Sequence, residues 1–248
     1  MINGLWLMSK EKWIRSELLL GNDAMKKLQQ SHVLVVGLGG VGAYCAEQLC
    51  RNGIGEMTIV DADRVEYSNF NRQLLALEST LHLPKVEVMA ERLHQINPDI
   101  KLHAIQEFVR DAGTEILLSL ANYDYVIDAI DSLSPKVYLV YFALKRNFRV
   151  ISAMGAGGKK DPSLIRVTDI KKTFQCRLAH AMRKRLHRLG VNSGFKAVFS
   201  PELVPENAVE LDPNPDINKL SVVGTISYMP AMFGCFMAAE VIRDLIEV

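Results

Sequence analysis

The sequence predicts an α/β protein with a Rossmann-like, largely parallel sheet and helices on both of its faces. Short apolar runs rich in β-branched residues alternate with helical patterns as far as residue 152. A glycine-rich stretch follows the first run, and the 248 residues are 49% hydrophobic and 23% charged, which is enough for one sizeable core. Because parallel strands are joined by right-handed crossovers, we expect ligands to bind beyond the carboxyl ends of the strands.

The expected elements alternate in a regular order along the first part of the chain. Strands are predicted at Val33–Val36, Met57–Val60, Lys101–Ile105, Tyr125–Ile127 and Val150–Ser152. Helices are predicted at Val41–Arg51, Lys85–Gln95, Thr114–Leu120 and Pro135–Arg146. Alternation of this kind is typical of a parallel sheet.

The pattern changes after a second glycine-rich loop, Gly155–Gly158. From there we expect a strand at Leu164–Asp169, a basic helix at Phe174–Arg188, a strand at Ala197–Phe199, a loop rich in Pro, Asn and Asp up to about Lys219, and a final apolar helix. We therefore predict a single domain with three parts: an N-terminal helical segment (1–30), a nucleotide-binding Rossmann-like core (31–158) and a basic C-terminal α+β extension (159–248) that binds substrate.

The loop after the first strand carries the nucleotide signal. Its glycines are Gly37, Gly39, Gly40 and Gly42. Glycines at this spacing let the backbone turn sharply and approach a phosphate at a helix N-terminus. Asp61 follows the next strand, where a ribose hydroxyl needs an acceptor. The loop and Asp61 alone also fit an NAD-binding oxidoreductase or regulator, but the downstream cations Arg72 and Lys85 favour a triphosphate that is cleaved.

Positive charge is concentrated in one segment, Lys159–Arg188. This segment holds ten Lys and Arg against two Asp, so it carries +8 and the rest of the chain carries −7 of the overall +1. Such asymmetry favours contact with a polyanion, whereas the alternative is a solvated helix face. Arg183, Lys184 and Arg185 are consecutive and cannot share one helix face, so part of the segment must face solvent.

Compartment and metal signals are weak. We see no basic leader followed by a long apolar run, so we expect no export signal and a cytoplasmic protein. The apolar stretch Met229–Ala239 is too short to span a bilayer, so we expect no membrane association. The four cysteines include no Cys-x-x-Cys pair, so neither a zinc ribbon nor a disulfide framework is indicated.

Several motifs together resemble the superfamily of ubiquitin-activating-type adenylating enzymes, the ThiF/MoeB-like proteins. They occur in the family's order: the glycine loop, Asp61-x-Asp63, Ser68-Asn69-Phe70-Asn71-Arg72-Gln73, Pro84-Lys85 and Asp128-Ala129-Ile130-Asp131. In that family a carboxylate attacks the α-phosphate of ATP and gives an acyl adenylate. The resemblance therefore implies ATP and Mg²⁺ as cofactors.

The resemblance also implies roles for individual residues. It assigns the ribose hydroxyls to Asp61, the phosphates to Asn69, Arg72 and Lys85, Mg²⁺ to Asp131, and the nucleotide backbone to the glycine loop, with Asp63 and Gln73 beside them. Taken singly, several of these residues have plainer explanations. A lysine after Pro84 is common at the start of a helix, and Asp131 suits the cap or turn of the next helix.

Within this superfamily the chain resembles the tRNA threonylcarbamoyladenosine dehydratases. The resemblance covers nearly the whole chain and includes Gly155–Gly158 and Val167–Thr173. It implies ATP-dependent cyclisation of N6-threonylcarbamoyladenosine beside the anticodon, with the basic segment contacting the tRNA. The alternative is an adenylyltransferase of a ubiquitin-like sulfur carrier, which usually holds zinc on two Cys-x-x-Cys pairs. The sequence does not say which tRNAs are bound, whether the product ring is an oxazolone or a hydantoin, or whether a cysteine desulfurase or other sulfur-relay protein is a partner.

The same resemblance bears on two further residues, Arg15 and Cys176. Arg15 matches an arginine that the family delivers to the triphosphate of the partner subunit, which implies a homodimer; a solvated helix charge is the alternative. Cys176 stands where many relatives have an acid-proline pair, and we interpret it as a buried thiol rather than a nucleophile.

Overall fold

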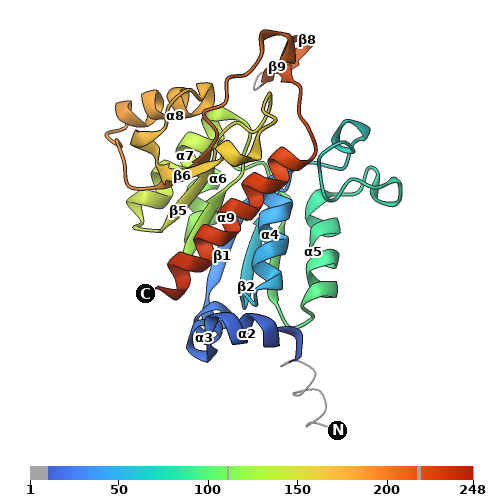
Figure 1. Cartoon of the computed structure of the whole chain (residues 1–248), viewed down its shortest axis with the longest axis vertical. Helices are drawn as coiled ribbons and strands as arrows, with labels where there is room; N and C mark the ends of the chain where they lie inside the picture. The colour runs from blue at the N-terminus through green and yellow to red at the C-terminus, as the bar shows by residue number, and fades with distance from the viewer. Residues whose placement is uncertain (1–10, 111, 217–218, 248) are drawn as a thin grey trace.

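The computed structural model describes residues 11–110, 112–216 and 219–247. A seven-stranded sheet in the order β3-β2-β1-β4-β5-β7-β6 forms the centre of the molecule, with helices on both faces (Figure 1). All neighbouring strands are parallel except β6, which runs antiparallel to β7. The predicted α/β fold is therefore confirmed.

The strands of this sheet are β1 (His32–Val36), β2 (Glu56–Val60), β3 (Lys101–Ile105), β4 (Tyr125–Asp128), β5 (Val150–Ala153), β6 (Arg166–Asp169) and β7 (Lys196–Phe199). A separate antiparallel pair consists of β8 (Val209–Asp216) and β9 (Lys219–Val223). The helices are α2 (Ile14–Leu20), α3 (Asn22–Gln30), α4 (Gly42–Arg51), α5 (Lys85–Ile96), α6 (Ala112–Ser119), α7 (Leu133–Lys145), α8 (Arg177–Arg188) and α9 (Tyr228–Ile246).

The strand-helix alternation of the first part of the chain is as predicted, with most ends within one or two residues. The first ten residues of the predicted N-terminal helical segment (1–30) lie outside the described part, and α2 and α3 form the rest. The strands are short and apolar because both faces are covered; all five residues of β1 are buried. The edge strand β3 is the exception and is largely exposed.

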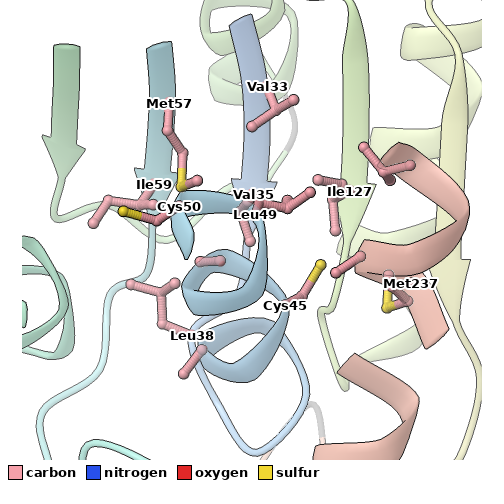
Figure 2. Close-up of a cluster of buried hydrophobic side chains, with 14 of the residues drawn as sticks. Val33, Val35, Leu38, Cys45, Leu49, Cys50, Met57, Ile59, Ile127 and Met237 are labelled. Atoms are coloured by element: carbon pink, nitrogen blue, oxygen red, sulfur yellow. The ribbon is translucent and has the colours of Figure 1, made fainter. Parts of the chain in front are cut away.

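Each face of the sheet has its own core. Alternate residues of a strand point to opposite faces, so Val33 and Val35 pack on one side, while Leu34 and Val36 pack on the other. The first core joins α3, α4, α5 and α9 to the sheet, and Figure 2 shows Val35 beside Leu49 and Cys45 of α4. The second core joins α6, α7 and α8. In the described part of the chain, the helices are too short or too polar to cross a membrane.

The last third of the chain departs from three predictions. The loop expected up to about Lys219 contains the strand β8, which pairs with β9 just after it; edge strands tolerate the Pro residues that suggested a loop. The expected strand from Leu164 begins instead at Arg166, because Asp161 caps a short 3₁₀ turn at Pro162–Leu164. The basic helix begins at Arg177, after Gln175 with a positive φ of 53°.

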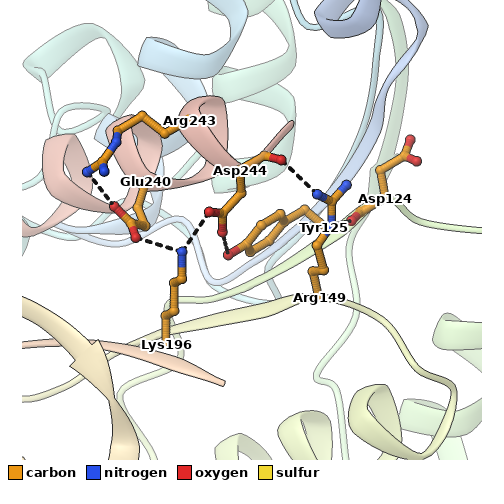
Figure 3. A network of polar contacts seen from close by, with 7 residues as sticks. All are labelled: Asp124, Tyr125, Arg149, Lys196, Glu240, Arg243 and Asp244. Atoms are coloured by element: carbon orange, nitrogen blue, oxygen red, sulfur yellow. Dashed lines mark hydrogen bonds and ion pairs between the residues drawn. The ribbon is translucent and has the colours of Figure 1, made fainter. Parts of the chain in front are cut away.

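A polar network fastens α9 to the amino ends of the central strands. Lys196 of β7 lies 2.7 Å from Glu240 and 2.6 Å from Asp244, measured from Nζ to the carboxylate oxygens. The hydroxyl of Tyr125 donates to Asp244 at 2.7 Å, and Arg149 donates to the backbone carbonyl of Asp244 at 2.9 Å (Figure 3). The last helix therefore spans the sheet from the glycine loop, where Pro230 lies, to the opposite edge.

Candidate active site at the carboxyl edge of the sheet

The glycine loop connects β1 to α4 in a conformation that only glycine fits at two points. Gly37 has a φ of +92°, and a Cβ there would lie 2.7 Å from the carbonyl oxygen of Ala129. A Cβ on Gly42 would lie 1.8 Å from the carbonyl oxygen of Gly37. The loop is therefore folded tightly onto the end of β4 and leads directly into the N-terminus of α4, which suits an anion.

Asp61 fixes this loop to the end of β2. Its Oδ2 accepts the backbone N–H of Leu38 at 2.6 Å, and its Oδ1 accepts that of Asp63 at 2.8 Å. Burial raises the pKa of the Asp61 carboxyl, while the cation of Lys85 and the two backbone donors act against that rise. The predicted ribose acceptor thus also organises the loop, and its remaining lone pairs are available to a hydroxyl.

Lys85 is the first residue of α5, and its cation acts on both Asp61 and Asp63. Its side chain is only 4% exposed, and its Nζ lies 2.9 Å from Oδ2 of Asp63. The backbone carbonyl of Asp63 also accepts the N–H of Lys85 at 3.0 Å. A lysine that follows Pro84 by chance would face solvent, whereas this one is buried at the carboxyl edge.

The segment predicted to bind phosphates lies against the glycine loop. A Cβ on Gly40 would be 3.2 Å from the carbonyl oxygen of Arg72, and one on Gly39 would be 3.8 Å from Nε2 of Gln73. Asn69 is buried, and its Oδ1 accepts the backbone N–H of Glu66 at 3.2 Å. The guanidinium of Arg72 donates to Ser68 and Asn71 of the same turn, so its position is set locally.

A buried ion pair that we did not predict as part of the site supports the end of β4. Nζ of Lys136 lies 2.8 Å from Oδ2 of Asp128, and both side chains are fully buried. Ser152 donates to the same carboxylate at 2.6 Å, and Lys136 also donates to the carbonyl of Ile130 at 3.0 Å. Burial raises the pKa of the Asp128 carboxyl, and Lys136 opposes that rise. The sequence did carry a signal for this pair. Asp128 is an acid at the end of an apolar strand, as Asp61 is, and such an acid needs a partner.

Asp131 lies at the same edge, in the turn that this ion pair holds. Strand β4 is the direct neighbour of β1, and the N–H of Ala129 donates to the carbonyl of Val36 at 2.9 Å. The Asp131 side chain is exposed. The structure therefore brings the glycine loop, Asp61, Lys85, the 69–73 turn and Asp131 to one edge.

Arg15 lies elsewhere. It is exposed on α2, at the amino edge of the sheet (Figure 1). The indole N–H of the neighbouring Trp13 donates at 3.1 Å to the carbonyl of Arg51, at the far end of α4 from the glycine loop. Since α4 has ten residues and rises about 1.5 Å per residue, Arg15 is remote from the glycine loop of its own chain.

The basic segment is mostly exposed, with two exceptions. Lys159 is 3% exposed and donates to the carbonyls of Ser200 and Glu202, and burial lowers its pKa. Including Lys159 among the polyanion contacts was therefore wrong, because backbone carbonyls enclose its ammonium group. Arg183 is half-buried and donates to Thr173. The exposed cations are Lys160, Arg166, Lys171, Lys172, Arg177, Lys184, Arg185 and Arg188.

The second glycine loop follows β5 and lies between the basic helix and the β8–β9 hairpin. A Cβ on Gly155 would be 3.9 Å from Leu178 of α8, and one on Gly157 would be 3.0 Å from Val223 of β9. The N–H of Gly158 donates to the carbonyl of Gly224 at 2.7 Å. The basic helix thus begins beside a loop that is itself at the carboxyl edge.

The cysteine thiols are free and packed. Cys45, Cys50 and Cys176 are buried, and Cys235 is partly buried. Burial raises the pKa of Cys50 to about 11 and that of Cys45 still further. A thiol with a raised pKa is a poor nucleophile, so the surroundings of Cys45 and Cys50 favour a packing role.

Comparison with known proteins identifies the family of this chain. The ThiF family model matches residues 14–248. The tRNA threonylcarbamoyladenosine dehydratase of Bacillus subtilis (strain 168) is 36% identical over 239 residues, which is 94% of each chain. A crystal structure of the Escherichia coli tRNA N6-threonylcarbamoyladenosine dehydratase in complex with ATP has a TM-score of 0.87 and 34% identity, and the match covers 96% of this chain and 95% of that one.

The likeness to carrier-protein enzymes is less extensive. The sulfur carrier protein ThiS adenylyltransferase of Escherichia coli (strain K12) is 36% identical over 139 residues, 55% of each chain. That match covers about half of the present chain, whereas the match to the Bacillus subtilis dehydratase covers 94% of it. Family membership also decides against the NAD-binding alternative, which depended on the glycine loop and Asp61 alone. The chain therefore belongs to the ThiF family and, within it, to the tRNA threonylcarbamoyladenosine dehydratases.

Proposed function

We propose that the carboxyl edge of the sheet is the site at which this ATP-dependent tRNA threonylcarbamoyladenosine dehydratase activates its substrate, within a chain that works as one domain. The observation that carries the proposal is the convergence of the glycine loop, the N-terminus of α4 and the buried Lys85 on one edge. Fixed cations and backbone N–H groups at such an edge stabilise the charge that accumulates on a phosphate under attack.

The reaction has two steps. The threonyl carboxylate of N6-threonylcarbamoyladenosine attacks the α-phosphate of ATP, the bond to the β-phosphate breaks, and pyrophosphate leaves. The carbamoyl group of the same nucleoside then attacks the activated carbonyl carbon, a ring closes and AMP leaves. The net loss is one water, whose oxygen stays on AMP. Because the second step is intramolecular, proximity replaces a protein nucleophile, which agrees with the packed cysteines.

Individual residues take the following roles in the proposal. Lys85 leaves Asp63 for the phosphates, Arg72 and Asn69 contact them from the adjacent turn, and Asp61 accepts the ribose hydroxyls. Gly39, Gly40 and Gln73 flank the phosphates, and the ion pair of Asp128 and Lys136 holds the turn at the end of β4.

Mg²⁺ is assigned to Asp131. An exposed carboxylate at this edge suits a hard cation, whereas the carboxylate of Asp128 is enclosed by Lys136 and Ser152. When bound, Mg²⁺ would neutralise charge on the phosphates. We expect Asp131→Asn to raise the Mg²⁺ concentration needed for half-maximal activity, whereas Asp99→Asn, an exposed control near the start of β3, should leave it unchanged.

The exposed cations of the basic segment are proposed to contact tRNA phosphates. Lys184→Gln with Arg185→Gln should weaken tRNA binding and reduce the steepness of its salt dependence by about one unit per cation removed. Lys145→Gln, which removes an exposed cation on α7, is the matched control. Equal slopes for the control and the double variant would contradict this interface.

A homodimer is proposed from α2. Leu18 and Leu19 are each 83% exposed beside Arg15, which suits burial against a second copy. In such a dimer Arg15 would act on the partner's nucleotide. Mixing Arg15→Ala with Lys85→Ala protein tests this, because only mixed dimers then contain an intact site. We expect about a quarter of wild-type activity after subunit exchange, and none if each chain works alone.

The reaction itself is tested with tRNA that bears N6-threonylcarbamoyladenosine, ATP and Mg²⁺, followed by digestion and mass spectrometry. We expect the nucleoside to lose one water with wild-type protein and with Lys145→Ala, but not with Lys85→Ala. With ¹⁸O in the threonyl carboxylate, the label should appear in AMP. Pyrophosphate release that requires a small carrier protein, with no change in the nucleoside, would instead point to the carrier-protein branch.

A further inference from the structure

Two histidines and a glutamate meet at the amino edge of the sheet, away from the nucleotide loop. In the parallel register His32 of β1 pairs with Glu56 of β2, and Thr58 of β2 pairs with His103 of β3. Because residues two apart on a strand point to the same face, Glu56 and Thr58 lie on one face with both histidines. The backbone therefore sets this cluster, which draws on three neighbouring strands.

The ligand atoms of the cluster lie at distances that suit one metal ion. Nε2 of His103 is 2.8 Å and Nδ1 of His32 is 3.5 Å from Oε1 of Glu56. The three residues can offer ligand atoms that all lie within 4.8 Å of one another. Tetrahedral Zn²⁺ with bonds of about 2.0–2.1 Å places its ligands about 3.3 Å apart, so small side-chain movements complete the geometry.

The other ring nitrogen of His32 faces a hydroxyl group. Its Nε2 lies 2.9 Å from Oγ1 of Thr58. A hydroxyl oxygen can accept a hydrogen bond, so Nε2–H of His32 can donate to Thr58. In that tautomer the lone pair of Nδ1 lies on the side of Glu56.

This arrangement is typical of a metal-binding histidine. Such a histidine usually donates its other ring N–H to a fixed partner, which orients the ring and selects the tautomer. His32 is 8% exposed, and its backbone N–H donates to Asp124 at 2.7 Å, so its position is held from two sides.

We propose that His32, Glu56 and His103 bind a divalent transition-metal ion, with Zn²⁺ as the best fit and water as the fourth ligand. Two imidazoles and a carboxylate are a donor set that Zn²⁺ accepts. The side chain of His103 is 46% exposed, which leaves the fourth position open to solvent. The ion would link the edge strand β3 to β2 and β1, and it would lie at the opposite end of the strands from the proposed nucleotide site.

Lys101 is the competitor for this site. Its Nζ lies 2.9 Å from Oε1 of Glu56, and its side chain is 68% exposed. Without metal, Lys101 neutralises Glu56; because it is exposed, it can turn away into solvent when an ion binds. A purely ionic cluster and a metal site therefore make opposite predictions for the removal of this lysine.

The test uses untagged full-length protein, with Co²⁺ as a spectroscopic probe and Zn²⁺ in calorimetry. We expect one tetrahedral Co²⁺ per chain, displaced by Zn²⁺, and a rise in Tm with Zn²⁺. His103→Ala and Glu56→Gln should weaken binding by about 100-fold or more, and Thr58→Val by about 10-fold. Lys101→Met should bind more tightly than wild type. His187→Ala, an exposed histidine on α8, should bind like wild type.

Two outcomes would overturn the proposal. If His103→Ala and wild type bind Co²⁺ and Zn²⁺ equally, the ion occupies another group, such as a cysteine thiol. If wild type binds neither ion, and Lys101→Met only loses stability, the cluster is an ion-pair network. His103 is exposed enough that its alanine variant should fold, and urea unfolding of the metal-free variants verifies this. Neither outcome depends on dehydratase activity.

Discussion

The two edges of the sheet both gather charged side chains, but they hold them by different means. At the carboxyl edge Asp61 is partly buried and Asp128 is fully buried, and they accept hydrogen bonds from backbone groups, a serine or a buried lysine. At the amino edge Glu56 faces Lys101 and His103 at the surface, and strand register alone sets their spacing. The first edge includes loops that must keep one shape, whereas the second is regular strand.

The two edges should respond differently to substitution. Removing one partner of a buried ion pair leaves an uncompensated buried charge. An exposed ion pair contributes little to stability, because water solvates whichever partner remains. We therefore expect the carboxyl edge to be sensitive in both stability and activity. Lys101 and His103 at the amino edge should tolerate substitution in both as long as no metal is present.

The largest effect should separate the two edges directly. Asp128→Asn and Lys136→Met should each lower the free energy of unfolding by about 3–5 kcal/mol, because the other member of the pair stays buried. Lys101→Met at the amino edge should cost less than about 1 kcal/mol. Urea unfolding measures all three. Similar losses at both edges would show that the buried pair is no more sensitive than the exposed one.

The glycine loop provides a matched pair of substitutions. Gly42→Ala should cost about 3 kcal/mol, since its Cβ would lie 1.8 Å from the carbonyl oxygen of Gly37. Gly39→Ala meets only Gln73 at 3.8 Å and should fold normally, but we expect weaker ATP binding because the backbone can no longer approach the phosphates closely. Calorimetry with ATP and thermal unfolding distinguish the two; a folded Gly39→Ala with unchanged affinity would place the phosphates elsewhere.

Ligand-dependent stability should report on the carboxyl edge alone. ATP with Mg²⁺ at about 100 times its Kd should stabilise the protein by about 2.7 kcal/mol, and NAD should not. His103→Ala at the amino edge should keep the full ATP effect. If this variant loses the ATP effect, ATP binding at the carboxyl edge is coupled to the amino edge.

A smaller effect concerns the helices behind the site. Glu47 of α4 forms ion pairs with Arg51 and with Arg92 of α5, which ties the glycine-loop helix to the Lys85 helix. Burial alone would raise the pKa of Glu47, but the two arginines lower it below its usual value. The ion pairs of Glu47 therefore stabilise the folded protein fully above the usual pKa of a glutamate. This stabilisation is lost as pH falls through the lowered pKa of Glu47 in the folded protein. We expect wild type to lose about 1 kcal/mol more than Glu47→Gln between pH 6 and pH 3 in urea unfolding. Parallel curves would contradict this.

The sequence was informative about strands and about the nucleotide loop because both depend on local patterns. Runs such as Val33–Val36 and the spacing from Gly37 to Gly42 carry their meaning within a few residues. The hairpin of β8 and β9 was missed because the Pro, Asn and Asp residues of β8 are typical of a loop and β9 is only five residues long. The burial of Lys159 was missed because it depends on carbonyls some forty residues away, at Ser200 and Glu202.

The convergence of side chains at the carboxyl edge was predictable for residues within the family motifs and less so for residues outside them. Asp61, Lys85 and the 69–73 turn do converge, but the sequence could not show that Lys136 would be fully buried on Asp128, eight residues before it. The amino-edge cluster was also missed. His32, Glu56 and His103 are far apart in the chain, and only the parallel register brings them together.

The contact of Lys85 with Asp63 has a consequence for selectivity. Before nucleotide arrives, the ammonium group already has an anionic partner 2.9 Å away, so the resting enzyme does not present a bare cation. If Lys85 takes the phosphates as proposed, binding is an exchange of partners, and an incoming anion must outcompete a carboxylate that is tethered in place. A single phosphate of the RNA backbone, or inorganic phosphate, would gain little in that exchange. A triphosphate that also contacted the loop and the helix N-terminus would gain more, and Asp63 would then act as an internal competitor that selects among anions.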